Sequence, residues 1–198
     1  LNDRGEWVTS SLYYPEFLDV QANATSLEDV ALFFYAGSSV QDREGRPMNL
    51  TTGEGTASLP DVVGIQPLMG RWFLPQEVGP EEVNVVVLGE SFWRDRFGAD
   101  PEIVGSTIRV ERSPYTVIGV MPAEFRLRLS LFSDSLQLLA PRASGERPIW
   151  IPTGHNYGDS WHVDRSGFTF EAIARLKPGV TIEAALAHYA GYLVLFVD

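Results

Sequence analysis

The sequence contains no cysteine, and only one of its 15 basic residues is a lysine, the others being arginine. Without cysteine the chain has no disulfide framework, no thiolate nucleophile and no thiolate metal site. Acidic residues outnumber basic ones, which gives a formal net charge of −11. Nucleic-acid backbones and anionic lipid surfaces are bound by concentrated basic faces. We therefore expect neither as a partner.

Long hydrophobic runs are also missing. The longest candidate for a membrane span, Tyr189–Val197, is far shorter than the ~20 residues that a helical span requires. The first residues do not have the pattern of a signal peptide. We therefore expect that the chain itself is not inserted in a membrane. Its 198 residues are enough for one large or two small domains.

The clearest local patterns lie in the middle of the chain. Val83–Leu88 is a short apolar run bounded by glycine, which predicts a buried strand. Ser91–Phe97 places Phe92, Trp93, Arg96 and Phe97 on one helical stripe, with Gly98 as the stop signal. We expect Ser91 to cap this helix and Trp93 to be buried.

Two pairs of segments are expected to form β-hairpins, because strand-like runs flank short turn sequences. They are Ser106–Glu111 with Tyr115–Met121 around Arg112-Ser113-Pro114, and Ala31–Gln41 with Arg46–Thr52 around Asp42–Gly45.

The remaining segments carry weaker signals from turn residues and helix caps. They predict a helix at Pro15–Asn23, a short capped turn at Ser26–Asp29, a turn-rich connection with a short helix at Leu59–Gly70, a flexible insertion at Leu127–Glu146, a strand at Gly167–Leu176, and a helix at Thr181–Tyr192 capped by Thr181.

Several motifs resemble, in order, those of one known family. The central block is VVVLGESFWRDRFGADPEIVGSTIRVERSPYTVIGVMPAEF, and it is preceded by VGIQPLMGRWF at Val63–Phe73. Ile149–Pro152, Ala174–Thr181 and Tyr14–Asp19 match further elements of the pattern. Together they are similar to the periplasmic core domain of MacB-like and FtsX-like ABC transporter permeases.

This resemblance implies an α+β fold in two lobes. One lobe would be a split, porter-like βαβ subdomain formed by residues 1–58 and 163–198. The other would be an inserted β-rich, Sabre-like subdomain formed by residues 59–162. The resemblance also implies that the domain is a periplasmic loop between two membrane-spanning helices of an inner-membrane protein.

The resemblance further implies that the domain is not an enzyme and couples movement of the membrane helices to a partner or substrate. Its partners would be a second permease copy, a periplasmic adaptor or another envelope protein, and an ATPase domain or subunit outside this chain. No cofactor is implied.

The densest set of polar, chemically versatile side chains is the His155–Asp164 segment. Its H-x3-D-x2-H-x-D spacing matches no metal-binding motif of known geometry. The simpler interpretation is a surface loop that packs or docks, with His155, Tyr157, Trp161 and His162 as an interaction loop. The alternative function is a secreted α+β enzyme or metal-binding protein that uses this loop.

Other catalytic patterns are incomplete. The sequence around Ser91 lacks the second glycine of a nucleophile elbow, and no phosphate-binding loop is present. We therefore predict no catalytic, cofactor-binding or metal-binding residues. A set of large aromatic side chains could stack on a ligand but is expected to form core, because such side chains dominate buried area. It comprises Trp72, Phe73, Trp93, Phe97 and Trp150.

Overall fold

The structure is a computed structural model that describes residues 10–41, 45–81, 83–127, 148–154, 157, 161–165, 169–181, 183–185 and 195–197. Its strands form one mixed ten-stranded sheet in the order β1-β9-β2-β3-β8-β5-β7-β4, with β10 beside β9 and β6 beside β2 and β7. The strands are β1 Ser10–Leu12, β2 Leu27–Gln41, β3 Pro47–Gly55, β4 Met69–Gly70, β5 Val85–Gly89, β6 Thr107–Val110, β7 Ser113–Met121, β8 Ile149–Pro152, β9 Phe170–Leu176 and β10 Leu195–Val197. The helices are α1 Tyr14–Asn23, α2 Leu59–Val63, the 3-10 turn η1 Pro75–Glu77, and α3 Glu90–Phe97. The predicted α+β class is confirmed.

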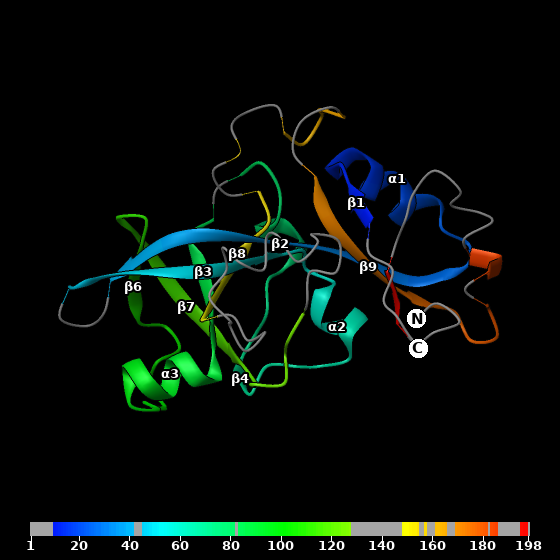
Figure 1. The fold of residues 1–198 in the computed structure, drawn as a ribbon. Coiled ribbons are helices and arrows are strands. Elements are labelled where there is room, and N and C mark those ends of the chain that lie inside the picture. The colour runs from blue at the N-terminus through cyan, green and yellow to red at the C-terminus, as the bar shows by residue number, and fades with distance from the viewer. Residues whose placement is uncertain are drawn as a thin grey trace, which may run out of the picture.

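The long β2–β3 hairpin crosses the molecule (Figure 1). β2 pairs with β9 near its start, with β3 from Phe33 to Gln41, and with β6 at its far end. The hairpin prediction is therefore confirmed, but β2 begins earlier than expected. The capped turn predicted at Ser26–Asp29 is wrong, because Leu27 and Asp29 pair with β9 as part of the strand. This non-local pairing overrides the local capping pattern.

The strands nearest the two ends of the chain share one edge of β9. β1 pairs antiparallel with Phe170–Ala172, and β10 pairs parallel with Ile173–Arg175. The other edge of β9 is occupied by β2. In Figure 1 the blue β1 and the red β10 accordingly lie beside the orange β9. The strand predicted at Gly167–Leu176 is confirmed over its described part.

The β5–α3 unit follows the predicted order. All residues of β5 are buried, and α3 ends at Gly98, which adopts a left-handed conformation with φ of 63°. Trp93 is only 7% exposed, as expected, and its indole Nε1 donates to the Asp100 carbonyl. The predicted Ser91 cap is wrong, since Gly89 is the N-cap and Ser91 lies within the helix. Arg96 is exposed rather than part of the buried stripe.

The β6–β7 hairpin is confirmed, but its turn lies earlier than predicted. Glu111 and Arg112 form the turn, with φ of 48° and 73°, and Val110 pairs with Ser113. Two consecutive residues with positive φ match the twist of the flanking strands, which a turn centred on Ser113 does not. Ser113 and Pro114 therefore belong to β7.

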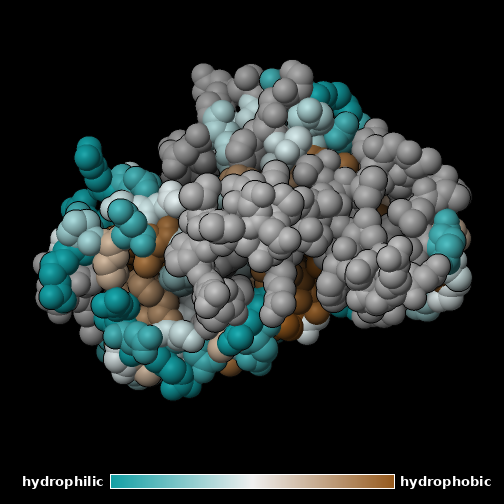
Figure 2. Space-filling view, viewed as in Figure 1, coloured by the Kyte–Doolittle hydropathy of each residue, from teal (hydrophilic) through white to brown (hydrophobic). Residues whose placement is uncertain are grey.

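Three groups of buried side chains form the core, one beneath α1 and β9, one around Trp72 and Trp150, and one beneath α3. Trp150 packs directly on β3, where a Cβ on Gly53 would lie 2.5 Å from the indole. All five aromatic side chains expected in the core are at most 7% exposed. On the face shown in Figure 2, the described surface around α3, β6 and β7 is mostly hydrophilic, with hydrophobic residues gathered inside that rim.

The other helix predictions are confirmed where they can be followed. α1 contains Pro15 in its first turn, and α2 is the short helix expected after residue 58. Residues 183–185 are helical, and the Ala184 amide donates to Thr181 Oγ1. Residues 186–192 and the predicted insertion beyond Leu127 lie outside the described residues.

Among the described helices, none has the length and apolar character needed to cross a bilayer. The assignment of residues 1–58 with 163–198 to one subdomain and 59–162 to another stays a prediction. Strand pairing joins the two predicted subdomains, because β3 pairs with β8 and β2 pairs with β6.

Candidate functional site: a cleft between α1, α2 and η1

A cleft of about 410 Å³ lies between α1 and the segment that contains η1. Tyr14, Phe17 and Leu18 of α1 line one side of it. The opposite side is the segment 73–78, which contributes Phe73, Pro75 and Val78. The two sides come from different predicted subdomains. This placement makes the cleft the natural candidate for a functional site.

The base of the cleft is formed by residues 56–58, which connect β3 to α2. Thr56 is fixed to β2, because its Oγ1 accepts from the Leu32 amide at 2.9 Å and its amide donates to the Leu32 carbonyl at 3.0 Å. Ser58 Oγ donates to the Val30 carbonyl at 2.7 Å. The base is therefore held rigidly against the sheet.

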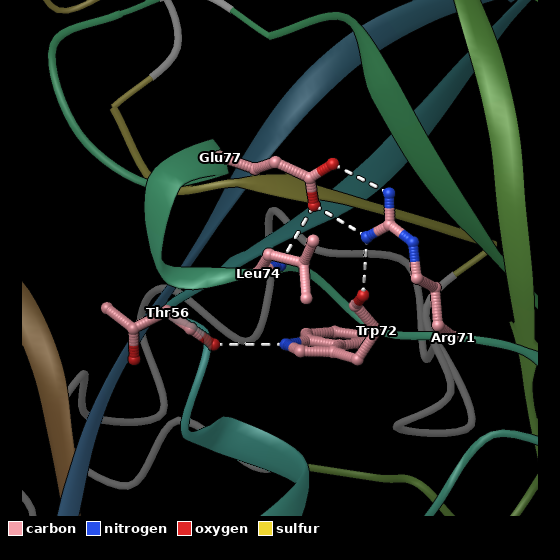
Figure 3. A network of polar contacts seen from close by, with 5 residues as sticks. All are labelled: Thr56, Arg71, Trp72, Leu74 and Glu77. Atoms are coloured by element: carbon pink, nitrogen blue, oxygen red, sulfur yellow. Dashed lines mark hydrogen bonds and ion pairs between the residues drawn. The ribbon is translucent and has the colours of Figure 1, made fainter.

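The segment 73–78 is held by the polar network in Figure 3. Arg71 donates to both carboxylate oxygens of Glu77, each at 2.7 Å, and the Leu74 amide donates to the same carboxylate at 2.8 Å. The Trp72 indole Nε1 donates to the Thr56 carbonyl at 3.0 Å. Thus the Trp72 indole links the start of the segment 73–78 to the base of the cleft, and the bidentate Arg71–Glu77 ion pair stabilises the turn between them.

Electrostatics agree with this geometry. The guanidinium of Arg71 holds the pKa of the Glu77 carboxyl below its usual range, and Glu77 in turn raises the pKa of Arg71. These two shifts mean that both groups are ionised at neutral pH. The Glu77 side chain is only 10% exposed and the Arg71 side chain is 43% exposed, so the ion pair lies at the protein surface.

Two carboxyl groups, Asp29 and Asp61, also line the cleft. Burial raises the pKa of Asp29, the Val30 amide partly offsets this effect, and the negative charges of Asp61 and Glu28 raise the pKa further. Asp61 accepts a hydrogen bond from Gln66 at 2.7 Å. Neither aspartate forms an ion pair with any residue in the described part of the chain. Among the described residues, the cleft thus combines apolar sides with two carboxyl groups that no ion pair neutralises.

A second buried acid lies elsewhere, on β3. Glu54 is 4% exposed, and burial raises its pKa to about 8, although the Tyr157 hydroxyl and the Gly154 amide partly counter this effect. Burial likewise raises the pKa of Tyr157. At neutral pH Glu54 is therefore mostly protonated. Sequence reasoning missed this residue; its only signal is an acidic residue between Gly53 and Gly55, just beyond the expected strand Arg46–Thr52.

The structure brings three of the four predicted interaction residues together. Trp161 is 6% exposed and packs on Tyr14, with ring centroids 4.5 Å apart. Tyr157 is half-buried 5.6 Å from Trp161, and the half-buried His162 ring lies 6.0 Å from it. His155 lies outside the described residues. The two larger aromatics thus face the core, and the role of the loop in interaction stays a prediction.

The alternative metal site depends on the same loop. Within the part of the chain that the structure describes, no three histidine or acidic side chains come together as a metal-binding group. His155 and Asp159 lie outside that part. The prediction that the chain has no metal-binding, cofactor-binding or catalytic residues therefore stays a prediction.

The fold is that of extracytoplasmic domains of ABC transporter permeases. The periplasmic region of MacB from Actinobacillus actinomycetemcomitans superposes with a TM-score of 0.61 at 15% identity, over 87% of this chain and 69% of that one. A domain of a protein described as a permease from Porphyromonas gingivalis gives 0.64 at 14% identity, over 93% and 81%. The extracellular domain of the noncanonic ABC-type transporter YknZ from Gram-positive bacteria gives 0.58 at 12% identity, over 94% and 98%.

The sequence agrees with the fold. The model of the MacB-like periplasmic core domain family matches residues 3–189, and the chain belongs to this family. No curated protein matches the chain. The protein is thus a periplasmic, extracytoplasmic domain of a bacterial ABC transporter permease, as the sequence motifs predicted. The alternative of a secreted enzyme or metal-binding protein is not favoured.

Proposed function

We propose that this domain couples movement of the permease's membrane helices to the handling of a substrate or protein partner, without catalysis of its own. The observation that carries this proposal is the pairing of β1 and β10 with consecutive residues of β9. A permease with membrane helices on both sides of the domain would pull on this one strand. Any displacement there would pass through hydrogen bonds into β2.

The rest of the sheet supports the same role. β2 continues past β9 for the length of the hairpin and reaches β6 on the far side of the molecule. Adjacent strands are linked by backbone hydrogen bonds, so a displacement at β9 can pass along the sheet and shift α1 relative to the segment 73–78. The energy would come from an ATPase domain or subunit outside this chain. A second permease copy and an adaptor or other envelope protein would be the other partners.

The experiment joins the two sides of the cleft in the full-length permease. Leu18 and Leu74 are both exposed, at 43% and 39%, and the chain has no cysteine of its own. Leu18→Cys with Leu74→Cys can be bridged by a bismaleimide whose linker contains a reducible disulfide. The bridge should abolish the transport or activation function, and reduction should restore it.

The matched control bridges Leu18→Cys to Ala22→Cys within α1 and should leave function intact. Full function in the bridged double variant would refute coupling through relative movement of these two sides.

A further inference from the structure

The cleft is lined by apolar side chains on two sides. On α1, Leu18 is 43% exposed beside the buried rings of Tyr14 and Phe17. On the opposite side, Phe73 and the half-buried Val78 complete an apolar wall. The volume of about 410 Å³ is within the range of sites that hold small organic molecules. An inorganic ion would gain nothing from these walls.

The two aspartates have unused capacity to accept hydrogen bonds. Asp29 accepts from the Val30 amide at 2.7 Å, and Asp61 accepts from Gln66 Nε2 at 2.7 Å. A carboxylate has about four acceptor positions. Each group can therefore accept further bonds from a ligand without losing its present partner.

Two basic side chains, one on β9 and one just after it, donate to backbone carbonyls. Arg175 stands opposite Asp29 in the β2–β9 pairing, but its guanidinium donates to the Val62 carbonyl at 2.6 Å. Lys177 donates to the Thr25 carbonyl at 2.9 Å. Desolvating Asp29 without a cation costs free energy, and a bound cation would recover part of that cost.

We propose that this cleft binds a small organic cation, with its ammonium group against Asp29 and Asp61 and its apolar body between α1 and the segment 73–78. An anion would be repelled by the two carboxylates. A neutral apolar molecule would desolvate them further without compensation. A ligand that has both an ammonium group and an apolar body can pair with the carboxylates and pack against the apolar walls at the same time. This inference does not depend on the proposed coupling role, since it can be tested on the 198-residue chain alone.

The first experiment compares three probes of one size by isothermal titration calorimetry. They are 4-phenylbutylamine, 4-phenylbutan-1-ol and 4-phenylbutanoate. The amine should bind about tenfold more tightly than the alcohol. Raising the salt concentration should reduce this difference in affinity, because salt screens the attraction between the ammonium group and the carboxylates. The carboxylate should bind most weakly. Equal affinities for amine and alcohol, or no binding of the amine, would overturn the proposal.

The second experiment assigns the binding to named side chains. Asp29→Asn and Asp61→Asn should each weaken amine binding about fivefold and leave alcohol binding nearly unchanged. Leu18→Ser should weaken the binding of both probes. Asp95→Asn, an exposed position on α3, is the matched control and should bind as the wild type does. Circular dichroism confirms that each variant is folded. Undiminished amine binding by a folded Asp29→Asn/Asp61→Asn double variant would place the amine elsewhere and overturn the proposal.

The same chemistry can come from a free amine or from a lysine side chain in a peptide. Titration with acetyl-Phe-Lys-amide separates these sources. Tighter binding of the peptide than of 4-phenylbutylamine indicates a peptide ligand, and the reverse order indicates a small molecule. Both results support a cation site, provided that the two Asn variants weaken the binding.

Discussion

Two buried side chains show how differently residues contribute to this domain. Trp93 fills the core beneath α3 and satisfies its indole N–H on the Asp100 carbonyl. Glu54 is buried to a similar degree, but its burial favours the protonated acid over the carboxylate. The first residue therefore stabilises the fold at any pH, whereas the contribution of the second depends on its proton.

Replacing Trp93 should be severely destabilising. Trp93→Ala should lower the free energy of unfolding by about 3–5 kcal/mol, because it leaves a cavity in the core and removes the indole hydrogen bond to the Asp100 carbonyl. Denaturant unfolding followed by circular dichroism measures this loss. Arg94→Ala, the exposed neighbour on the same helix, is the control and should cost far less. An unchanged midpoint in Trp93→Ala would show that this face of α3 contributes little to the core.

Glu54 should make stability depend on pH. The unfolded chain releases the Glu54 proton near pH 4.5, while the folded protein keeps it until about pH 8. Because the folded state binds more protons in this window, the free energy of unfolding should fall as pH rises, by at most about 1.4 kcal/mol per pH unit. Glu54→Gln removes the titrating group. Its stability relative to wild type should therefore increase from pH 5 to pH 8.

Urea unfolding of both proteins at several pH values tests this expectation. Glu102→Gln, an exposed position, serves as the matched control and should follow the wild-type curve. If the curves for Glu54→Gln and wild type run parallel, the pKa of Glu54 is not raised in the folded protein.

Elements whose determinants are local in sequence could be predicted, and those fixed by distant pairing could not. Gly98 ends α3 where the sequence places a stop signal, and both hairpins form between the expected segments. By contrast, the N-terminal part of β2 is a strand because β9 pairs with it. The local sequence Ser26–Asp29 carries no information about this distant partner strand. The parallel pairing of β8 with β3 is equally remote in sequence. The cleft has the same origin, since Asp29, Asp61 and Val78 come from three separate segments.

The segment 73–78 gives an element-scale prediction. Glu77→Ala removes the carboxylate that accepts from Arg71 and from the Leu74 amide, so the turn should loosen. We expect a loss of about 1–2 kcal/mol in the free energy of unfolding, as for a removed helix cap with a charged partner. Amide hydrogen exchange should also rise between residues 71 and 78. Glu81→Ala, a nearby exposed position, should change neither quantity.

At the scale of the whole molecule, one mixed sheet carries the family's periplasmic core domain. The family, the mixed sheet and the sequence motifs agree on a periplasmic permease domain. The motifs could be recognised because they lie at turns and buried strands, where the backbone dictates residue type. Cargo and partners depend on surface residues, which such motifs do not specify.

The isolated chain should hydrolyse no ATP and bind zinc only weakly. It has no phosphate-binding loop, and the spacing of His155 and His162 matches no known metal geometry. A coupled ATPase assay and equilibrium dialysis against zinc measure the two properties. Stoichiometric zinc that disappears in His155→Ala/His162→Ala would contradict this prediction and revive the alternative of a metal-binding protein.

In the proposed coupling role, the β2–β3 hairpin would act as a lever arm that pivots on β9 at the peptide bond between Ala172 and Ile173. β1 ends its pairing at Ala172 and β10 begins at Ile173, so the two outer strands meet at adjacent residues. From Phe33, the last residue of β2 that pairs with β9, the strand continues to Gln41. At ~3.3 Å per residue this arm is about 26 Å long. A 10° tilt at β9 would therefore move the tip of the hairpin by roughly 5 Å, a distance that can open or close a contact with a partner.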